Sequence, residues 1–361
     1  MIETGRPIAQ DKAGRQDWLI LSDSLTLPAS VTKDSLLDSG LFVAELTLPL
    51  SAQTLLLEIS STIGWPRTFS LFYEPTVGLV LLHRQGQRVV RHVLPGPFPE
   101  DDGQARVCFR FDAPARQWDL SFELLGEDET GLQRPDKKIW ARGRDPLPLR
   151  IGDISELATR ASWTHRDPAI LWFGLSRGRA LPNRLPWIGP RTPIETSLGP
   201  RMAGQLQAGD LVRTLEGGFA PLISVRQFEL PSCGSFASVL LRAPYFGEQH
   251  DLLMSSDQQI VLSGPEVEYL FGSEEVLIKA CELVDGHTAI LDQRRTVTRS
   301  VALYFDRPIL AVADGCAMLC QSPKELSTPS SRSCLRHDEA ITLMALLGRA
   351  ARGKASAVRM L

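Results

Sequence analysis

The side chains best suited to catalysis or metal binding are few in this chain and lie far apart. The six cysteines stand at positions 108, 233, 281, 316, 320 and 334, and the six histidines at positions 83, 92, 165, 250, 287 and 337. Cys316 and Cys320 have the spacing of half a metal site, but no histidine or second cysteine pair lies at a matching distance. We therefore expect no zinc site, no cofactor, and reduced, mostly buried thiols rather than a disulfide framework.

Short motifs that would define an active site are missing. The sequence contains no G-x-G-x-x-G, no P-loop, no H-E-x-x-H and no G-x-S-x-G. We interpret Cys233, in the loop ELPSCGSF, as an exposed thiol rather than a nucleophile, because cleavage there would need its carbonyl partner alongside a base. His250 directly precedes an expected strand, and we interpret it as a surface or edge histidine.

The composition is that of an ordinary folded, soluble protein with two domains. The chain has 361 residues, of which 43% are hydrophobic and 22% charged, and its formal net charge is -3. This small net charge gives no overall electrostatic attraction to nucleic acid. No uncharged apolar run reaches about 18 residues, so we expect no transmembrane helix. The polar start, MIETGRPIAQDKAGRQDW, lacks the apolar core of a signal peptide, which leaves the cytoplasm or a signal-independent export route.

Residues 41–125 have the pattern of short strands separated by turns. Their apolar and β-branched stretches lie at 41–50, 52–60, 67–73, 77–83, 87–94, 105–111 and 117–125. In the sixth stretch, ARVCFRF, apolar side chains alternate with Arg106, Cys108 and Arg110. This alternation predicts one packed face and one face in water. Seven strands with almost no helical pattern predict a β-sandwich, and their rhythm resembles that of jelly-roll domains.

Three tryptophans in this half have side chains that suit a sugar ring. Trp65, Trp118 and Trp140 would stack on carbohydrate, as the aromatic residues of sugar-binding jelly rolls do; the alternative is packing in the core or at a sheet edge. The sequence therefore leaves the partner of this half open between a carbohydrate ligand and another protein.

The stretch between the two halves is rich in charge and proline. Residues 126–150 are charged and contain three prolines, so we expect irregular structure there, whereas residues 151–161 favour a short helix. Five prolines between residues 176 and 200 exclude a regular helix in that region. We therefore predict a β-sandwich domain at 1–186, including its proline-rich connection, and a second domain at 187–361.

The C-terminal half carries four blocks whose order is informative. The first, TPIETSLGPRMAGQLQAGDLVRTLEGGFAPLISV (192–225), has a threonine-bearing strand, a tight Gly209-Asp210 turn and a glycine-closed hairpin. The other blocks are at 251–290, 302–319 and 334–347. In this order they resemble the Hint (hedgehog/intein) domain of bacterial proteins. The resemblance implies a Hint-like all-β domain that ends in a helix.

The last block, CLRHDEAITLMALL, predicts that C-terminal helix by its spacing. Ala340, Leu343, Met344 and Leu347 repeat at helical intervals, with acidic residues at the start of the segment and arginines toward its end. We expect a helix docked on the domain through this apolar face. A basic helix that binds a membrane surface is the alternative.

Self-cleavage in the Hint family needs a nucleophile at the first residue of the domain and histidines that activate the scissile amide. The resemblance puts the nucleophile position at Trp187, five residues before Thr192, and the activating histidine at Gln258. The further histidines fall at Ala302 and Pro308. An indole is no nucleophile, and an amide exchanges no proton near neutral pH. The resemblance therefore implies that the catalytic residues have been lost.

Two functions from different classes are consistent with these residues. The first is a pseudoenzyme, a catalytically inactive Hint-domain protein that acts as a scaffold, interaction or ligand-binding module. The alternative is a self-cleaving Hint protein whose catalytic residues are displaced from the matched positions. Because tryptophan is much larger than cysteine, we also expect Trp187 to be at least partly buried in a widened slot near Gln258.

Overall fold

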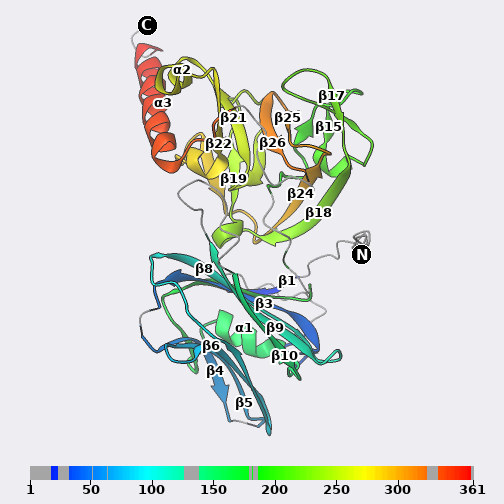
Figure 1. Ribbon diagram of the computed structural model, residues 1–361, viewed down its shortest axis with the longest axis vertical. Helices are drawn as coiled ribbons and strands as arrows, with labels where there is room; N and C mark the ends of the chain where they lie inside the picture. The colour runs from blue at the N-terminus through cyan, green and yellow to red at the C-terminus, as the bar shows by residue number, and fades with distance from the viewer. Residues whose placement is uncertain are drawn as a thin grey trace, which may run out of the picture.

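The computed structural model describes residues 18–22, 32–50, 52–62, 64–125, 138–178, 181, 186–322 and 332–358. Strands dominate it, as the sequence predicts. Figure 1 shows two groups of sheets, one built from N-terminal residues and the other from C-terminal residues. Each group has its own large hydrophobic cluster.

The N-terminal strands form two antiparallel sheets that pack face to face as a β-sandwich. The first sheet has the order β1 (Trp18–Leu21), β13 (Ile170–Ser176), β3 (Ser39–Leu48), β8 (Gly103–Asp112), β9 (Gln117–Leu125), β10 (Lys138–Arg144). The second has the order β12 (Thr164–Arg166), β4 (Thr54–Ser61), β5 (Arg67–Glu74), β6 (Gly78–Gln85), β7 (Arg88–Leu94). The rest of this part comprises the short pair β2 (Leu36–Leu37) and β11 (Leu149–Arg150), and helix α1 (Ile151–Ala158).

The seven strands expected between residues 41 and 125 are all present, as β3 to β9, and the expected short helix is α1. No strand was predicted at β1, β10, β12 or β13. The prediction of irregular structure is wrong for residues 138–144, which form β10 at the edge of the first sheet. Its sequence, KIWARGR, alternates between half-buried and exposed side chains, and its charges hid that alternation. The preceding residues 126–137 lie outside the described part of the chain.

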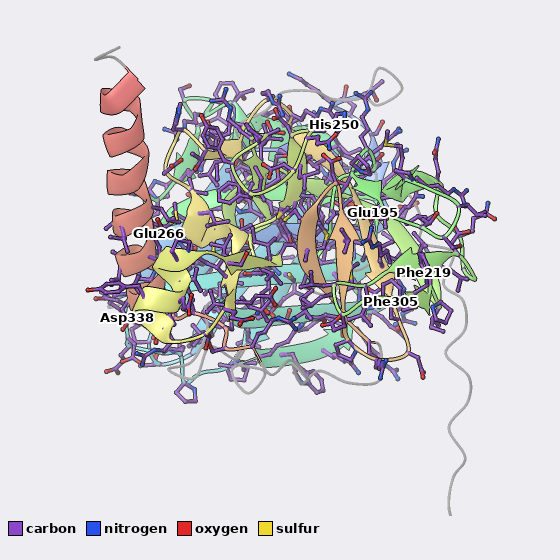
Figure 2. All side chains as sticks on the ribbon, turned by 90° about the horizontal axis from the view of Figure 1, so that it is seen from above. Glu195, Phe219, His250, Glu266, Phe305 and Asp338 are labelled. Atoms are coloured by element: carbon purple, nitrogen blue, oxygen red, sulfur yellow. The ribbon has the colours of Figure 1, made fainter. Side chains whose placement is uncertain are left out.

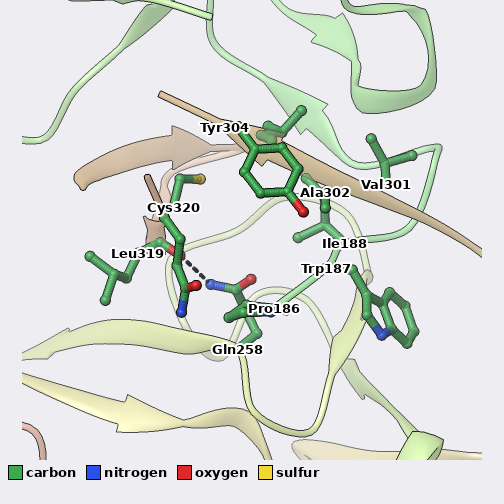
Figure 3. Close-up of a pocket in the computed structure, with 11 residues that line it drawn as sticks. Pro186, Trp187, Ile188, Gln258, Val301, Ala302, Tyr304, Leu319 and Cys320 are labelled. Atoms are coloured by element: carbon green, nitrogen blue, oxygen red, sulfur yellow. Dashed lines mark hydrogen bonds between the residues drawn. The ribbon is translucent and has the colours of Figure 1, made fainter. Parts of the chain in front are cut away.

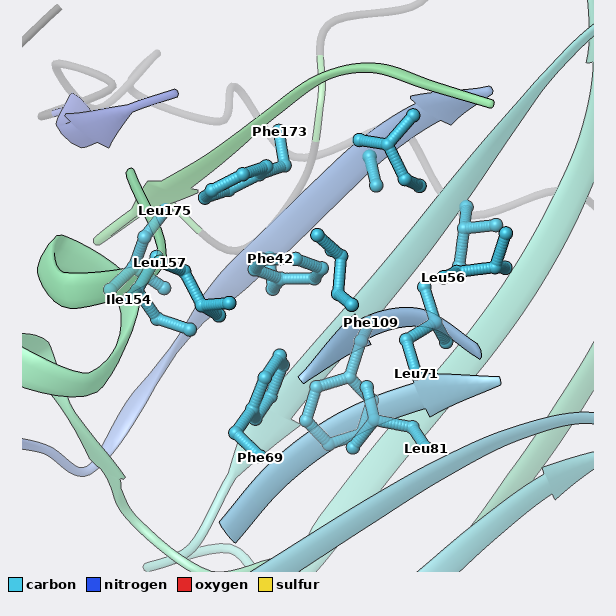
Figure 4. Packing of buried hydrophobic residues seen from close by; sticks show 14 of the residues in the cluster. Phe42, Leu56, Phe69, Leu71, Leu81, Phe109, Ile154, Leu157, Phe173 and Leu175 are labelled. Atoms are coloured by element: carbon cyan, nitrogen blue, oxygen red, sulfur yellow. The ribbon is translucent and has the colours of Figure 1, made fainter. Parts of the chain in front are cut away.

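Apolar side chains that alternate along the strands fill the sandwich core (Figure 4). Phe42 and Phe69 are fully buried, and their rings meet edge to face with centroids 5.1 Å apart. Ile154 and Leu157 of α1 belong to the same cluster, so the helix packs against the sandwich through its apolar side. Burying a phenylalanine or leucine side chain stabilises the fold by about 1.5–3 kcal/mol.

Strand β8 keeps the predicted packed face but has a different environment on its other face. Phe109 and Phe111 are fully buried in the core, and the Arg110 side chain is 47% exposed. Arg106 was expected in water with Arg110, and this expectation is wrong, because Arg106 is only 3% exposed. Phe236 from the C-terminal part covers it, with the Arg106 guanidinium 4.2 Å from the centre of the ring.

The C-terminal strands form one large sheet and several small ones, all antiparallel. The large sheet has the order β15 (Arg201–Met202), β14 (Pro193–Ile194), β25 (Ile309–Ala313), β26 (Cys316–Cys320), β21 (Gln259–Ser263), β22 (Glu275–Lys279). The small sheets are β16 (Leu211–Arg213) with β17 (Phe219–Pro221), β18 (Ser224–Pro231) with β24 (Val297–Tyr304), and β20 (Leu252–Ser255), β19 (Ser238–Leu241) and β23 (Ala289–Asp292). Short helical segments lie at α2 (Pro265–Phe271), Ala203–Gln205, Gly234–Phe236 and Ala280–Leu283.

Helix α3 (His337–Val358) is the expected amphipathic helix near the C-terminus, and Asp338 lies in its first turn (Figure 2). Ala340 and Leu343 are fully buried, and Met344 and Leu347 pack partly buried against the same cluster. The helix therefore docks on the C-terminal sheets, which favours the first of the two expectations over a membrane-binding helix. In the described residues, no helix is both long enough and apolar enough to cross a membrane.

Candidate functional site

The peptide group at residue 187 is held on both sides by the C-terminal strands. Trp187 donates its backbone N–H to the Ser255 hydroxyl at 3.1 Å, and its carbonyl accepts the Ser255 N–H at 2.9 Å. The next residue, Ile188, exchanges two backbone hydrogen bonds with Val301, at 3.0 and 2.8 Å. The chain therefore enters the C-terminal part between β20 and β24 with its backbone fixed like that of a strand.

A small pocket opens beside this peptide group (Figure 3). Its free space is about 10 Å³, roughly enough for one water molecule. The lining residues are Pro186, Trp187, Ile188, Gln258, Val301, Ala302, Leu303, Tyr304, Leu319, Cys320 and Gln321. Three of the four positions singled out from the sequence, Trp187, Gln258 and Ala302, thus meet in one place, whereas Pro308 is not among the lining residues.

Gln258 is held in the pocket by backbone hydrogen bonds. It is 3% exposed, and its side-chain amide donates to the carbonyl oxygens of Leu319 at 2.9 Å and Gln259 at 3.1 Å. Its own backbone N–H closes a turn on the carbonyl of Ser255. These contacts satisfy both amide hydrogens without using any proton transfer, so Gln258 serves here as a structural hydrogen-bond donor.

The indole of Trp187 leaves the pocket that its backbone lines. Trp187 is 4% exposed, and Figure 3 shows its ring turned away from Gln258. The ring lies in a separate group of buried residues, here called the junction cluster: Trp18, Leu21, Leu41, Val43, Trp172, Trp187, Leu230 and Phe236. The expected burial of Trp187 is confirmed, but the expected widened slot beside Gln258 is wrong. The indole instead lies in the junction cluster, together with buried residues of the N-terminal strands.

The described pocket residues include no histidine, carboxylate or amine. Burial raises the pKa of the Cys320 thiol to about 12 and also raises the pKa of Tyr304, so both groups are protonated near neutral pH. Nothing in this lining is therefore suited to take or give a proton at physiological pH. Neither Tyr304 nor Cys320 was predicted to lie at this site. Tyr304 belongs to the third block and Cys320 lies one residue beyond it, and that position was the available signal.

Other residues singled out from the sequence lie away from this pocket. Cys233 is not the exposed thiol expected; it is half-buried and packs against the junction cluster. His250 is a surface histidine as expected, with Nδ1 3.1 Å from a carboxylate oxygen of Asp314. Cys316 is buried like Cys320 on β26. Among the described residues, no group of three histidine, cysteine or acidic side chains is arranged to hold a metal ion.

The three tryptophans considered for sugar stacking are on separate elements. Trp65 is 61% exposed in the turn before β5, and Trp140 is 59% exposed on β10 of the other sheet. Trp118 is partly buried, and its indole N–H donates to the carbonyl of Arg144 at 3.2 Å. Two of the three side chains are therefore accessible, and they do not share one sheet.

Comparison with known proteins identifies the class to which the C-terminal part belongs. Residues 189–321 match the family model of the Hint domain, so the C-terminal part of this chain contains a Hint domain. Among solved structures, the chain is similar to the MchDnaB-1 intein (13% identity, TM-score 0.24, covering 37% of this chain and 99% of that chain). It is also similar to the gp41-1 intein (12% identity, TM-score 0.24, covering 38% and 98%).

A third similar structure is a sugar-binding protein. It is the Ruminococcus gnavus IT-sialidase CBM40 bound to alpha2,6 sialyllactose, with 17% identity and a TM-score of 0.24, covering 40% of this chain and 79% of that chain. No curated protein matches the chain in sequence.

Proposed function

We propose that this chain is a Hint-domain protein that does not cleave itself, and that its Hint domain is kept as a scaffold for the N-terminal sandwich. In this proposal the sandwich domain occupies residues 1–186 and the Hint domain residues 187–361. The observation that carries it is the composition of the pocket beside residue 187, where a peptide bond is firmly held but no described lining residue can act as acid, base or activated nucleophile.

The chemistry of self-cleavage explains why this composition matters. An N-to-S or N-to-O acyl shift needs a nucleophile on residue 187 itself, and departure of the amide nitrogen needs a proton donor. Trp187 supplies no nucleophile, and Gln258 supplies hydrogen bonds only. Ala302 adds a methyl group to the pocket. The four positions Trp187, Gln258, Ala302 and Pro308 are, in this proposal, those of the lost catalytic residues.

Self-cleavage by displaced residues is the alternative, and two nearby groups are its best candidates. The Ser255 hydroxyl lies 3.1 Å from the amide nitrogen of Trp187, and the Cys320 thiol lines the same pocket. The hydroxyl, however, accepts a hydrogen bond from that amide, and the thiol has a pKa of about 12. Because no base among the described lining residues activates either group, we favour the inactive form.

Intact mass tests the proposal directly. The purified protein should keep its full mass of 39.8 kDa after a day with dithiothreitol or hydroxylamine, both of which cleave thioesters and activated esters. Two fragments that end at residue 186 and begin at residue 187 would contradict it.

Single substitutions that restore one catalytic group should not restore cleavage. Trp187→Cys supplies a thiol and Gln258→His supplies a base, but catalytic groups that act as a unit are strongly non-additive, so each variant alone should stay whole. Trp187→Ala is the matched control for the first, because it empties the same volume without adding a thiol. Rapid cleavage by Trp187→Cys alone, with Trp187→Ala intact, would show that a working base survives near residue 187.

A carbohydrate ligand for the sandwich is a second candidate function, favoured by the exposure of Trp65 and Trp140. An exposed indole offers an apolar face on which a sugar ring stacks. Titration with oligosaccharides, followed by tryptophan fluorescence, should then show saturable binding that one of Trp65→Ala and Trp140→Ala removes. The same affinity in both variants would exclude these two residues.

A further inference from the structure

A buried carboxylate lies where the sandwich meets the Hint domain. Glu45 of β3 is fully buried, and its two oxygens accept hydrogen bonds from both parts of the chain. From the sandwich, Arg106 donates at 3.0 and 3.1 Å and the Trp172 indole N–H at 2.7 Å. From the Hint domain, Ser235 donates its backbone N–H at 2.8 Å and its hydroxyl at 2.5 Å.

The segment that reaches Glu45 is shaped for this contact. We call residues 232–237, around the short helical turn at Gly234–Phe236, the clamp loop. Gly234 has a φ of +56°, and a Cβ atom at this position would lie 2.0 Å from the Trp172 indole nitrogen and 2.2 Å from a Glu45 oxygen. Only glycine allows the backbone to come this close, so the backbone of the clamp loop itself touches the sandwich.

Aromatic packing surrounds the polar contact. The Phe236 ring lies 4.2 Å from the Arg106 guanidinium and meets the Trp172 ring edge to face, with centroids 6.0 Å apart. Trp18 meets Trp172 in the same way at 6.3 Å, and its indole N–H reaches the carbonyl of Glu229 in the Hint domain at 3.3 Å. Trp187 completes the junction cluster. Buried tryptophan and arginine around a satisfied polar centre form the pattern of energetic hot spots in stable interfaces.

We propose that the clamp loop and Trp187 form a recognition surface whose partner is the chain's own sandwich, so that the two parts stay bound even when the backbone between them is cut. The proposal rests on the proposed function in one respect, namely that residue 187 has been released from cleavage chemistry. Its indole then belongs to the junction cluster, which combines residues of the sandwich with residues of the Hint domain. In this proposal residue 187, the cleavage position of a self-cleaving Hint domain, helps to hold the two parts of the chain together.

The test is a cut made by a protease rather than by the protein. A recognition sequence for a specific protease, inserted between residues 182 and 185 of the full chain, is cleaved after folding, and the cut is verified on a denaturing gel. Size-exclusion chromatography of the cut protein should then show both pieces in one peak at the mass of the intact chain. Elution of the wild-type pieces at about half the mass of the intact chain would overturn the proposal.

Substitutions in the clamp loop identify the contact responsible. Gly234→Ala places a methyl group inside the Glu45 and Trp172 contact and should separate the cut pieces. The matched control is Gly272→Ala, because Gly272 has a similar φ of +65° but nothing within 4 Å of the added Cβ. Both variants place an alanine at a similar positive φ, and only the first should dissociate. Elution of the cut Gly234→Ala pieces at the mass of the intact chain would contradict the assigned role of the clamp loop.

A second pair of variants covers the case in which Gly234→Ala does not fold. Phe236→Ala removes the ring beneath Arg106 and should weaken association of the cut pieces about thirtyfold, the effect of losing one hot-spot side chain. Phe219→Ala, at a 52% exposed phenylalanine of the same domain, should have no effect. Equal affinities for the two variants would overturn the proposal. Spontaneous cleavage without protease would overturn the proposed function instead, so the two failures are distinguishable.

Discussion

Acidification from about pH 7.5 to about pH 5 should cost the protein about 4 kcal/mol of unfolding free energy, because two histidines are buried in the sandwich core. His83 on β6 is 1% exposed and His92 on β7 is fully buried. His83 meets the Phe69 ring edge to face, and the His92 ring lies 4.7 Å from the centre of Phe109. Among the described residues, neither ring nitrogen of His92 has a hydrogen-bond partner, so a charged imidazole would be poorly accommodated.

The magnitude follows from the pKa values. Burial, with a smaller contribution from the charge of His92, lowers the pKa of His83 from 6.5 to about 3, and burial lowers the pKa of His92 to about 4. Below pH 6.5 these two histidines bind protons in the unfolded chain but stay neutral in the folded protein, so the free energy of unfolding falls as the pH falls. One pH unit is worth about 1.4 kcal/mol per group, which over about 1.5 units gives about 2 kcal/mol for each histidine. The loss levels off only near pH 4 for His92 and near pH 3 for His83.

Urea denaturation followed by tryptophan fluorescence measures this effect. The midpoint of the wild-type protein should fall between the two pH values, and the fall should be largely absent in the double variant His83→Leu/His92→Leu. His287→Leu, at an exposed histidine, is the control and should keep the wild-type pH dependence. A midpoint independent of pH in the wild type, or an equal fall in the double variant, would refute the claim that these two imidazoles must stay neutral in the fold.

Two further predictions concern the C-terminal helix and the buried thiols. Leu343→Ala should destabilise the protein by about 2–5 kcal/mol, because it opens a cavity under α3. Ile341→Ala, at a 55% exposed side chain, is the control and should change stability by less than about 1 kcal/mol. The urea denaturation midpoints of the two variants measure the difference. Cys316 and Cys320 are buried, and burial raises the pKa of each thiol to about 12. Mass mapping after iodoacetamide treatment at neutral pH should therefore find both unmodified in the native protein and modified in urea, and rapid native labelling would be the contrary result.

The strands of the sandwich were predictable because their signal is local. In β8 each packed residue is two positions from the next, so the alternation identifies a strand whatever surrounds it. The same signal failed in β10, where Lys138, Arg142 and Arg144 stand at the exposed positions of an edge strand. Edge strands need only a weak apolar pattern, because one of their sides has no neighbour.

Local pattern could not predict the contact between the two parts. Arg106 was assigned to water because it stands on the polar face of its strand, and Trp187 was assigned to a slot beside Gln258 because of its position in the family pattern. The expectation for Arg106 fails because a segment more than a hundred residues away in the sequence covers that face and places the Phe236 ring against its guanidinium. The expectation for Trp187 fails because its indole lies in the junction cluster, whose residues come from both parts of the chain. Glu45, a single acid in the apolar stretch LFVAELTLPL, was the available signal, and it is directly paired with Arg106 across β3 and β8.

For the candidate site, the chemistry of the residues could be predicted from the sequence, whereas their arrangement required the structure. The residue types alone exclude acid–base chemistry at Trp187 and Gln258, and this exclusion needs no coordinates. That Trp187, Gln258 and Ala302 line one pocket required the fold, because they come from segments separated by 43 to 70 residues. The direction of the Trp187 ring, too, could be learned only from the structure. The backbone of residue 187 is hydrogen-bonded to Ser255 while its indole is turned away from the pocket, and the proposed non-cleaving scaffold accounts for both features.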